Sequence, residues 1–293
     1  MRILAHSVWD VLPVGAGLIH FGLVIGFFLA FPLLSWPTFF VLATIYSFSM
    51  AWSVNSVSHN FIHNPYFRSE PLNRLYAMVL SLTMAFSQTM YRHIHLLHHA
   101  GNMDRPNADG KTVDPISIYL HGSSGMPENP WKYALLSFFR DDAIGTYRAL
   151  KAKRPIEARW LLYEHIGVAV FYVAMFLADW RFVVCLAPFN YLGASLSQLN
   201  GYYEHYGANP DLPIAWGVSS YGRLYNWTWF NNGYHAEHHY RPRVHWTKMK
   251  ELHLEIAERQ RKAGVRVIRF AHVVGFLDGL RPDRRRGEAS GHG

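Results

Sequence analysis

The sequence predicts an all-α integral membrane protein in which four transmembrane helices form two hairpins and a cytoplasmic helical cap carries a histidine-rich site. Half of the 293 residues are hydrophobic and only 16% are charged, against roughly 25% charged residues in an ordinary soluble domain. Four apolar stretches have about the 20 residues that a helix needs to cross a bilayer. The chain also contains 18 histidines, which are unevenly distributed.

The four apolar stretches define the expected spans, at about residues 11–34, 38–57, 159–178 and 182–199. Short polar breaks at 35–37 and 179–181 separate the two members of each pair, and each pair is therefore expected to form a helical hairpin. Residues 1–280 are expected to form a single membrane-bound domain, followed by a basic, disordered tail at 281–293.

The distribution of charge predicts the orientation. The two short turns carry only Asp179 and Arg181, whereas Lys151, Lys153 and Arg154 lie on the opposite side. The positive-inside rule then places both termini and the central segment in the cytoplasm. The net charge is +8, but Lys and Arg gather at the ends of apolar segments, which indicates a membrane protein and argues against nucleic-acid binding.

Three segments outside the spans have recognisable patterns. Residues 73–90 are apolar but interrupted by Ser and Thr, as expected for an interfacial or partly inserted helix. Residues 102–129 are rich in Gly, Pro, Asp and Ser and predict an ordered loop. Residues 247–262 predict an amphipathic helix that packs over the domain, with an apolar face formed by Met249, Leu252, Ile256 and Ala257.

The histidines gather in three clusters with helical spacing. His59 and His63 stand at i and i+4 at the end of the second span, and such residues share one face of a helix. The second and third clusters both have the spacing i, i+3, i+4. The second consists of His95, His98 and His99, and the third of His235, His238 and His239. A ninth histidine, His205, follows the fourth span. Adjacent rings such as those of His98 and His99 diverge by about 100°, so each could reach a different metal.

These nine histidines predict a metal site. Imidazole is the commonest metal ligand in proteins, and burying so many titratable rings without a shared partner would be costly. Zinc usually takes four protein ligands, or three and a water, so nine histidines exceed one zinc site and would give two metals four or five ligands each. Imidazole suits zinc, copper, iron and nickel, and ligand type alone leaves the metal open. A single cysteine, Cys185, excludes a cysteine-based site within the chain.

The three clusters resemble the histidine boxes of the membrane fatty acid desaturase and hydroxylase superfamily: HxxxH at 59–63, HxxHH at 95–99 and HxxHH at 235–239. The resemblance covers about residues 38–246. It implies two iron ions, O2 as co-substrate and electrons supplied from outside the chain, and His205 stands where the superfamily places an additional ligand. Residues 200–207 also resemble bacterial alkane monooxygenases, although the second box departs from the HxxxHH pattern of that subgroup.

The resemblance implies oxidation of an unactivated C–H bond in a fatty acyl or lipid-like chain, with desaturation favoured. Hydroxylation, by a fatty acid hydroxylase or alkane-type monooxygenase, is the first alternative, because the same site gives an alcohol if a hydroxyl returns to the carbon. A zinc-dependent membrane lipid hydrolase is the second alternative, but it would need fewer histidines. No catalytic residue is expected beyond the metal ligands. A transporter would place its ligands at mid-membrane, whereas these lie past the ends of the spans.

The chain lacks a set of four cysteines for an iron–sulfur or rubredoxin centre and has no nucleotide-binding motif. A separate electron donor of the ferredoxin, rubredoxin or cytochrome b5 type is therefore expected to dock on the basic cytoplasmic face. The substrate chain is expected to occupy an apolar tunnel between the helices. The aromatic segment 225–230 could line the mouth of this tunnel or form a belt at the membrane interface.

Several polar residues are candidates for supporting roles. Glu204 and Glu237 lie beside predicted ligands and could accept hydrogen bonds from imidazole N–H groups, or else form surface salt bridges. Three asparagines are candidates for holding a metal-bound water: Asn200, Asn231 and Asn232. His93 is either a support for the second cluster or a solvated side chain. The remaining histidines are expected to be structural: His20, His121, His165, His245, His253 and His272.

Overall fold

The computed structural model describes residues 3–106 and 112–279, so the predicted tail at 281–293 lies outside the described residues. Within these ranges the chain is helical and forms only isolated β-bridges. Four helical segments are long and apolar enough to cross a membrane: Val8–Leu33, Trp36–His63, Pro155–Ala178 and Trp180–His205. The predicted all-α class and the four spans are thus confirmed, and each span begins two to four residues before its predicted start.

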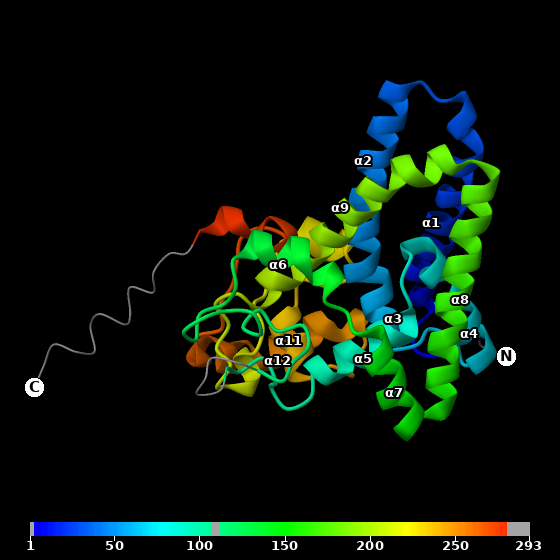
Figure 1. Cartoon of the computed structure of the whole chain (residues 1–293). Helices are drawn as coiled ribbons and strands as arrows, with labels where there is room; N and C mark the ends of the chain where they lie inside the picture. The colour runs from blue at the N-terminus through cyan, green and yellow to red at the C-terminus, as the bar shows by residue number, and fades with distance from the viewer. Residues whose placement is uncertain (1–2, 107–111, 280–293) are drawn as a thin grey trace, which may run out of the picture.

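Short capped turns separate the spans within each pair. The first span contains α1 (Val11–Ala30), and the second begins with α2 (Trp36–Ser53), which Ser35 caps by accepting a hydrogen bond from the Thr38 amide. The third is α8 (Pro155–Ala178), and the fourth is α9 (Trp180–His205), which Asp179 caps through the Arg181 amide. In space, α2 packs along α9 and α1 packs along the shorter helix α4 (Glu70–Met84) (Figure 1).

The close packing of α2 against α9 depends on Gly193. A Cβ atom added at this position would lie 2.9 Å from the Met50 Cβ and 2.9 Å from the Ser47 carbonyl oxygen. Small residues allow helices in a membrane to approach in this way. The contact matters for the site because the two spans that contain α2 and α9 end at the predicted ligands His63 and His205.

We expect Gly193→Val to destabilise the folded protein by about 1–3 kcal/mol, because the added side chain would overpack this contact. Thermal unfolding in detergent or nanodiscs measures the effect. The matched control is Gly26→Val in α1, where an added Cβ has no neighbour within 4 Å. Equal unfolding temperatures for the two variants would contradict the proposed role of the α2–α9 contact.

The single helix predicted at 73–90 is wrong. The segment divides into α4 and α5 (Gln88–His98), and Ala85 between them has a left-handed backbone with φ of 61°. Glu164 of α8 explains the break, since its buried carboxylate accepts hydrogen bonds from the Ser87 hydroxyl at 2.6 Å and the Thr89 amide at 2.8 Å. An acceptor and negative charge at a helix N-terminus favour a new start there. The break sets the direction of α5, which positions the second histidine cluster.

Several of the remaining helices, among them α6, α11 and α12, lie together beside the spans (Figure 1). The predicted amphipathic helix is α12 (Met249–Ala263), in which Met249, Leu252 and Ile256 are buried and Ala257 is half-buried. The described part of 102–129 is a loop of turns and bends, as predicted. The structure also contains short helices that the sequence patterns did not predict: α6 (Pro130–Leu136), a 3-10 turn (Ser137–Phe139), α7 (Ala143–Lys153) and α10 (Arg223–Thr228). Helix α11 (His235–Tyr240) carries the third histidine cluster, whose spacing predicted a helix.

Candidate metal centre

The first histidine pair is positioned by the end of the second span. Helix α2 continues through a π-helical turn (Val54–Ser58) into α3 (His59–His63). Such turns insert an extra residue into a helix and are frequent at functional sites. The turn is held to α9 because the Asn55 amide donates to the Ser197 hydroxyl at 3.1 Å. His59 and His63 therefore lie on a rigid continuation of a membrane span.

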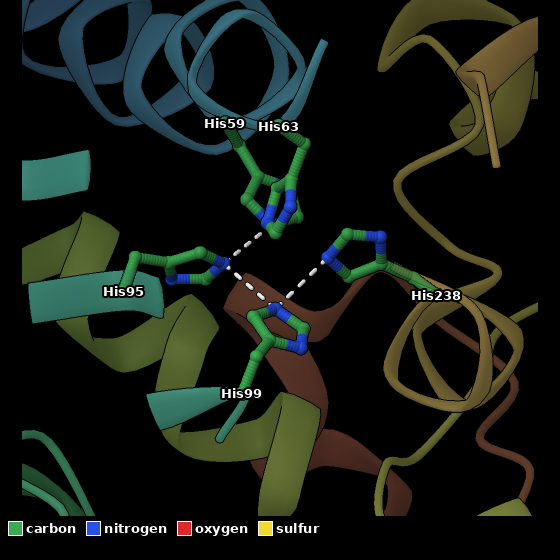
Figure 2. Close-up of side chains that lie close together, drawn as sticks. All are labelled: His59, His63, His95, His99 and His238. Atoms are coloured by element: carbon green, nitrogen blue, oxygen red, sulfur yellow. Dashed lines mark hydrogen bonds between the residues drawn. The ribbon is translucent and has the colours of Figure 1, made fainter. Parts of the chain in front are cut away.

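Five histidines from three helices converge on one point. Their nitrogen atoms lie within 4.8 Å of one another, and the residues are His59, His63, His95, His99 and His238. The rings come from α3, α5 and α11 and face a common centre (Figure 2). The Nε2 of His95 lies 3.0 Å from that of His59 and 3.0 Å from that of His99. The Nε2 of His238 lies 3.1 Å from that of His99.

A second group lies beside the first. The nitrogen atoms of His98, His205 and His239 also lie within 4.8 Å of one another. The His205 Nε2 is 2.9 Å from the His98 Nε2 and 3.1 Å from the Nε2 of His235, which joins this group. The structure thus brings all nine predicted histidines together. Histidines that are adjacent in sequence belong to different groups, as helical geometry predicted for His98 and His99.

Oxygen acceptors outside the two groups fix which ring nitrogen faces inward. The His98 Nδ1 lies 2.5 Å from Asp114 Oδ2, the His59 Nδ1 lies 3.0 Å from Asn232 Oδ1, and the His205 Nδ1 lies 3.4 Å from Asp104 Oδ2. Because the Asp114 and Asn232 oxygens accept hydrogen bonds, the Nδ1 atoms of His98 and His59 carry the proton and their Nε2 atoms present lone pairs. The His205 Nδ1 has no hydrogen-bond partner among the described residues and lies close to the charge of Asp104.

The inward lone pairs fit a metal. The Nε2 atoms of His98 and His205 lie 2.9 Å apart, close enough for both to bind one cation. The Nε2 atoms of His63 and His239 are buried without a hydrogen-bond partner among the described residues. A nitrogen donor set of this kind binds a first-row transition metal, so the residues present fit the group that the sequence predicted.

The electrostatics of the site favour the metal-binding form of the rings. Burial, followed by the neighbouring imidazoles, holds the pKa well below its ordinary value for five histidines outside the candidate spans: His95, His99, His235, His238 and His239. These rings are neutral at pH 7, as metal ligation requires. Burial would also lower the pKa of His98, but the charge of Asp114 raises it above the ordinary value. Asp114 therefore favours positive charge at His98, whether a proton or a metal supplies it.

Sequence patterns did not identify Asp104 and Asp114. Both carboxylates are buried and belong to the loop that follows the second cluster. Asp114 also accepts from the Ile116 amide at 3.0 Å, and Asp104 accepts from the Ser117 hydroxyl. The loop composition predicted turns, but no periodic spacing connects a loop residue to a helix face. The only signal was the presence of acids close in sequence to a histidine cluster.

Glu204 and Asn232 form a buried network behind the rings. The Asn232 amide donates to Glu204 Oε1 at 2.7 Å while its Oδ1 accepts from His59, and Asn200 donates to the same Glu204 oxygen at 2.8 Å. The network extends through the Tyr225 hydroxyl, 2.9 Å from His272 Nδ1. Of the asparagine candidates, Asn232 touches a predicted ligand, whereas Asn231 donates to the Trp246 carbonyl.

We expect Asn232→Leu to lower metal affinity by about 10-fold, because His59 would lose the acceptor that fixes its ring. Asn231→Gly is the matched control, since glycine tolerates the positive φ of 61° at that position. Metal titration of the two purified variants makes the comparison. A control that lost as much affinity as Asn232→Leu would contradict the role given to the His59–Asn232 hydrogen bond.

The other supporting candidates have different roles from those predicted. Glu237 is fully buried and accepts hydrogen bonds from Ser219, from Tyr221 and from His253 Nδ1 at 2.6 Å. Glu237 therefore accepts a hydrogen bond from an imidazole, as predicted, but the ring is that of His253 and not that of a predicted ligand. The predicted surface salt bridge is wrong because the carboxylate is buried, and the contact fastens α11 to α12. Most other histidines have the expected structural contacts, with His20 beside Ser49, His245 beside Asp10 and His272 beside Tyr225.

An apolar cavity of about 290 Å³ adjoins the two histidine groups. Five predicted ligands line its inner end: His59, His95, His98, His205 and His235. Its walls come mainly from α5, α8 and α9 and include Met90, Tyr91, Ile94, Val168 and Ala194. An apolar tunnel was predicted, but the segment at 225–230 does not contribute to this lining. The cavity gives an alkyl chain access to the point where the rings converge.

Four candidate spans, two converging histidine groups and an adjoining apolar cavity define a multi-pass membrane protein with a candidate polyhistidine metal centre. The chain belongs to the fatty acid desaturase family, whose model matches residues 33–271. The predicted resemblance is confirmed, and the family generally implies iron and a lipid substrate.

The curated relatives include three sphingolipid desaturases. A sphingolipid delta(4)-desaturase DES1-like protein of Oryza sativa subsp. japonica is 24% identical over 74% of this chain and 64% of its own length. The sphingolipid delta(4)-desaturases of Schizosaccharomyces pombe and Candida albicans are 27% and 26% identical, over 75% and 78% of this chain and 62% and 64% of their own lengths. The chain spans just under two thirds of the length of these relatives. No solved structure matches it significantly.

Proposed function

We propose that the chain is a di-iron, oxygen-dependent desaturase that introduces a double bond into the chain of a membrane lipid. The observation that carries the proposal is the convergence of nine histidines, in two groups, at the inner end of an apolar cavity. Family membership supports the reaction class, and the names of the three relatives support a sphingolipid-like substrate.

In this proposal each histidine group holds one iron. The first iron takes the five histidines of Figure 2, and the second takes His98, His205, His239 and the adjoining His235. The bound irons would activate O2 and so supply the oxidant for an unpolarised C–H bond, which acid, base and nucleophilic side chains cannot attack. Asp104, Asp114 and Asn232 hold the rings in the orientation that this binding needs.

The cavity residues position the substrate. Ile94 and Met90 of α5 and Ala194 of α9 provide an apolar wall that holds an alkyl chain and excludes water. The overall reaction balances when the substrate loses two hydrogens, the donor supplies two electrons with two protons, and O2 is reduced to two waters. Tight positioning of neighbouring carbons at the rings favours loss of the second hydrogen over return of a hydroxyl.

We infer the sidedness from charge. The positive-inside rule places the histidine groups and both termini in the cytoplasm, where an acidic redox protein of the ferredoxin, rubredoxin or cytochrome b5 type would supply electrons. Exposed Arg243 and Lys250, which follow the third histidine cluster, belong to the basic face that would attract it. Turnover with the correct donor should then fall as ionic strength rises, and insensitivity to salt would contradict this docking.

Product mass tests the proposed reaction. Cells that express the chain are expected to accumulate a lipid lighter by two hydrogens than its precursor, with no oxygen incorporated from labelled O2. Cells without the chain provide the reference profile. Gain of one labelled oxygen would instead establish the hydroxylase alternative, and an unchanged lipid profile in the presence of a competent electron donor would overturn the proposal.

A further inference from the structure

The cavity extends from the histidines into the level of the membrane spans. On α9 its lining includes Ala194, Gln198, Gly201 and His205, which share one face of the helix. The 11 residue-to-residue steps from Ala194 to His205 span about 16 Å at 1.5 Å per step. The outer end of the cavity therefore lies well within the length of a candidate span.

The segment between α6 and α7 forms the outer rim at this level. Phe138, Asp141 and Ala143 belong to the cavity lining. Tyr191, near the middle of α9, anchors the segment by donating a hydrogen bond to the Leu135 carbonyl at 2.6 Å, and its ring lies 5.6 Å from that of Phe139. The segment therefore lies at the same depth as Tyr191, which is inside the bilayer if α9 spans it.

The side chains around this rim suit contact with lipid. Phe139 is 70% exposed and Ile144 is 66% exposed, and exposed apolar groups beside a membrane span are stable where acyl chains cover them. The mouth of the cavity between α8, α9 and the α6–α7 segment therefore faces the membrane. A substrate can enter through it sideways, without leaving the bilayer.

The polar groups at the mouth are hydrogen-bond acceptors. The His165 Nδ1 donates to the Leu161 carbonyl at 2.8 Å, and in this Nδ1–H tautomer the Nε2 is an acceptor. The Asp141 carboxylate lines the same cavity. The protein around it raises the pKa of Asp141 to about 6 by desolvating it, although the residue as a whole is exposed. None of the described lining residues is a lysine or an arginine.

We propose that Asp141 is a specificity-determining residue, which accepts a hydrogen bond from the hydroxyl or amide N–H of a membrane-resident lipid that enters sideways. A free carboxylate or a phosphate at the same place would face a negative charge with no cation to offset it. The inference deepens the proposed function, because it names the polar end of the substrate whose alkyl chain extends toward the histidines.

Binding measurements test the inference separately from turnover. The probes are an N-acyl amino alcohol with a free hydroxyl and N–H, its fully methylated analogue, and a free fatty acid of equal chain length. Each is titrated into the whole protein in nanodiscs of neutral lipid. Asp141→Leu is expected to weaken binding of the amino alcohol by about 10-fold or more and to leave the methylated analogue unchanged.

Two further variants complete the design. Asp141→Asn keeps the size of the side chain and should improve binding of the fatty acid, because it removes the negative charge. Asp142→Asn is the matched control; Asp142 caps α7 through the Gly145 amide, lies outside the lining, and should leave all three affinities unchanged.

Two results would overturn the inference. In the first, Asp141→Leu weakens binding of the amino alcohol and of its methylated analogue equally. In the second, the wild-type protein binds the fatty acid more tightly than the amino alcohol. Selective binding without any desaturated product would overturn the proposed function and leave the role of Asp141 standing. If substitution of Asp141 left desaturation unchanged, the inference would be overturned and the proposed function would stand.

Discussion

Replacing His238 with alanine is expected to abolish product formation and to remove the metal held by the first histidine group. The His238 Nε2 lies 3.1 Å from the His99 Nε2, and its ring centroid lies 4.4 Å from that of His63. Loss of this ring leaves a gap in a buried donor set that no other described residue fills. Ligands act as a unit with the metal, so the effect on turnover should exceed that of any supporting residue.

The measurement is iron content and product yield of the purified variant, compared with His121→Ala. His121 is an exposed loop histidine outside the two groups and is expected to leave both quantities unchanged. An unfolding temperature near that of the wild type would show that the variant is folded. Full activity with a normal iron content in His238→Ala would contradict the assignment of this residue as a ligand.

Asp114→Ala is expected to lower metal affinity and turnover by about 100-fold, the upper end of the range for residues that orient metal ligands. The Asp114 carboxylate is fully buried and lies 2.5 Å from His98 Nδ1. Its removal takes away the charge that favours a cation at His98 and frees the ring to rotate. The loss should be larger than for Asn232→Leu, because Asn232 carries no charge.

Asp114→Asn separates the contribution of the negative charge from that of the hydrogen bond that orients the His98 ring. The amide oxygen can still accept the hydrogen bond from His98, but the negative charge is gone, so an intermediate loss is expected. Metal titration and turnover should decline in parallel through this pair of variants. If Asp114→Ala retained wild-type affinity, the oxygen acceptors would not be controlling the orientation of the rings.

Helical periodicity was sufficient to predict most of the site. The i, i+4 spacing of His59 and His63 and the divergence of His98 and His99 follow from helix geometry alone, and the structure brings the rings together as those patterns require. The four spans were predictable because a bilayer imposes a minimum apolar length.

Contacts between distant segments could not be predicted in this way. The break between α4 and α5 depends on Glu164, about 75 residues away in sequence from Thr89, and hydropathy gives no sign of that contact. Asp104 and Asp114 reach the rings through an irregular loop, where side-chain direction has no period. Glu237 stands within a histidine cluster in sequence, yet it faces His253 of α12.

Elemental analysis of the purified protein tests the central claim most directly. The two histidine groups predict about two iron atoms per chain, because each group offers enough nitrogen ligands for one transition metal. One zinc per chain with no iron would contradict the account and would favour the membrane hydrolase alternative.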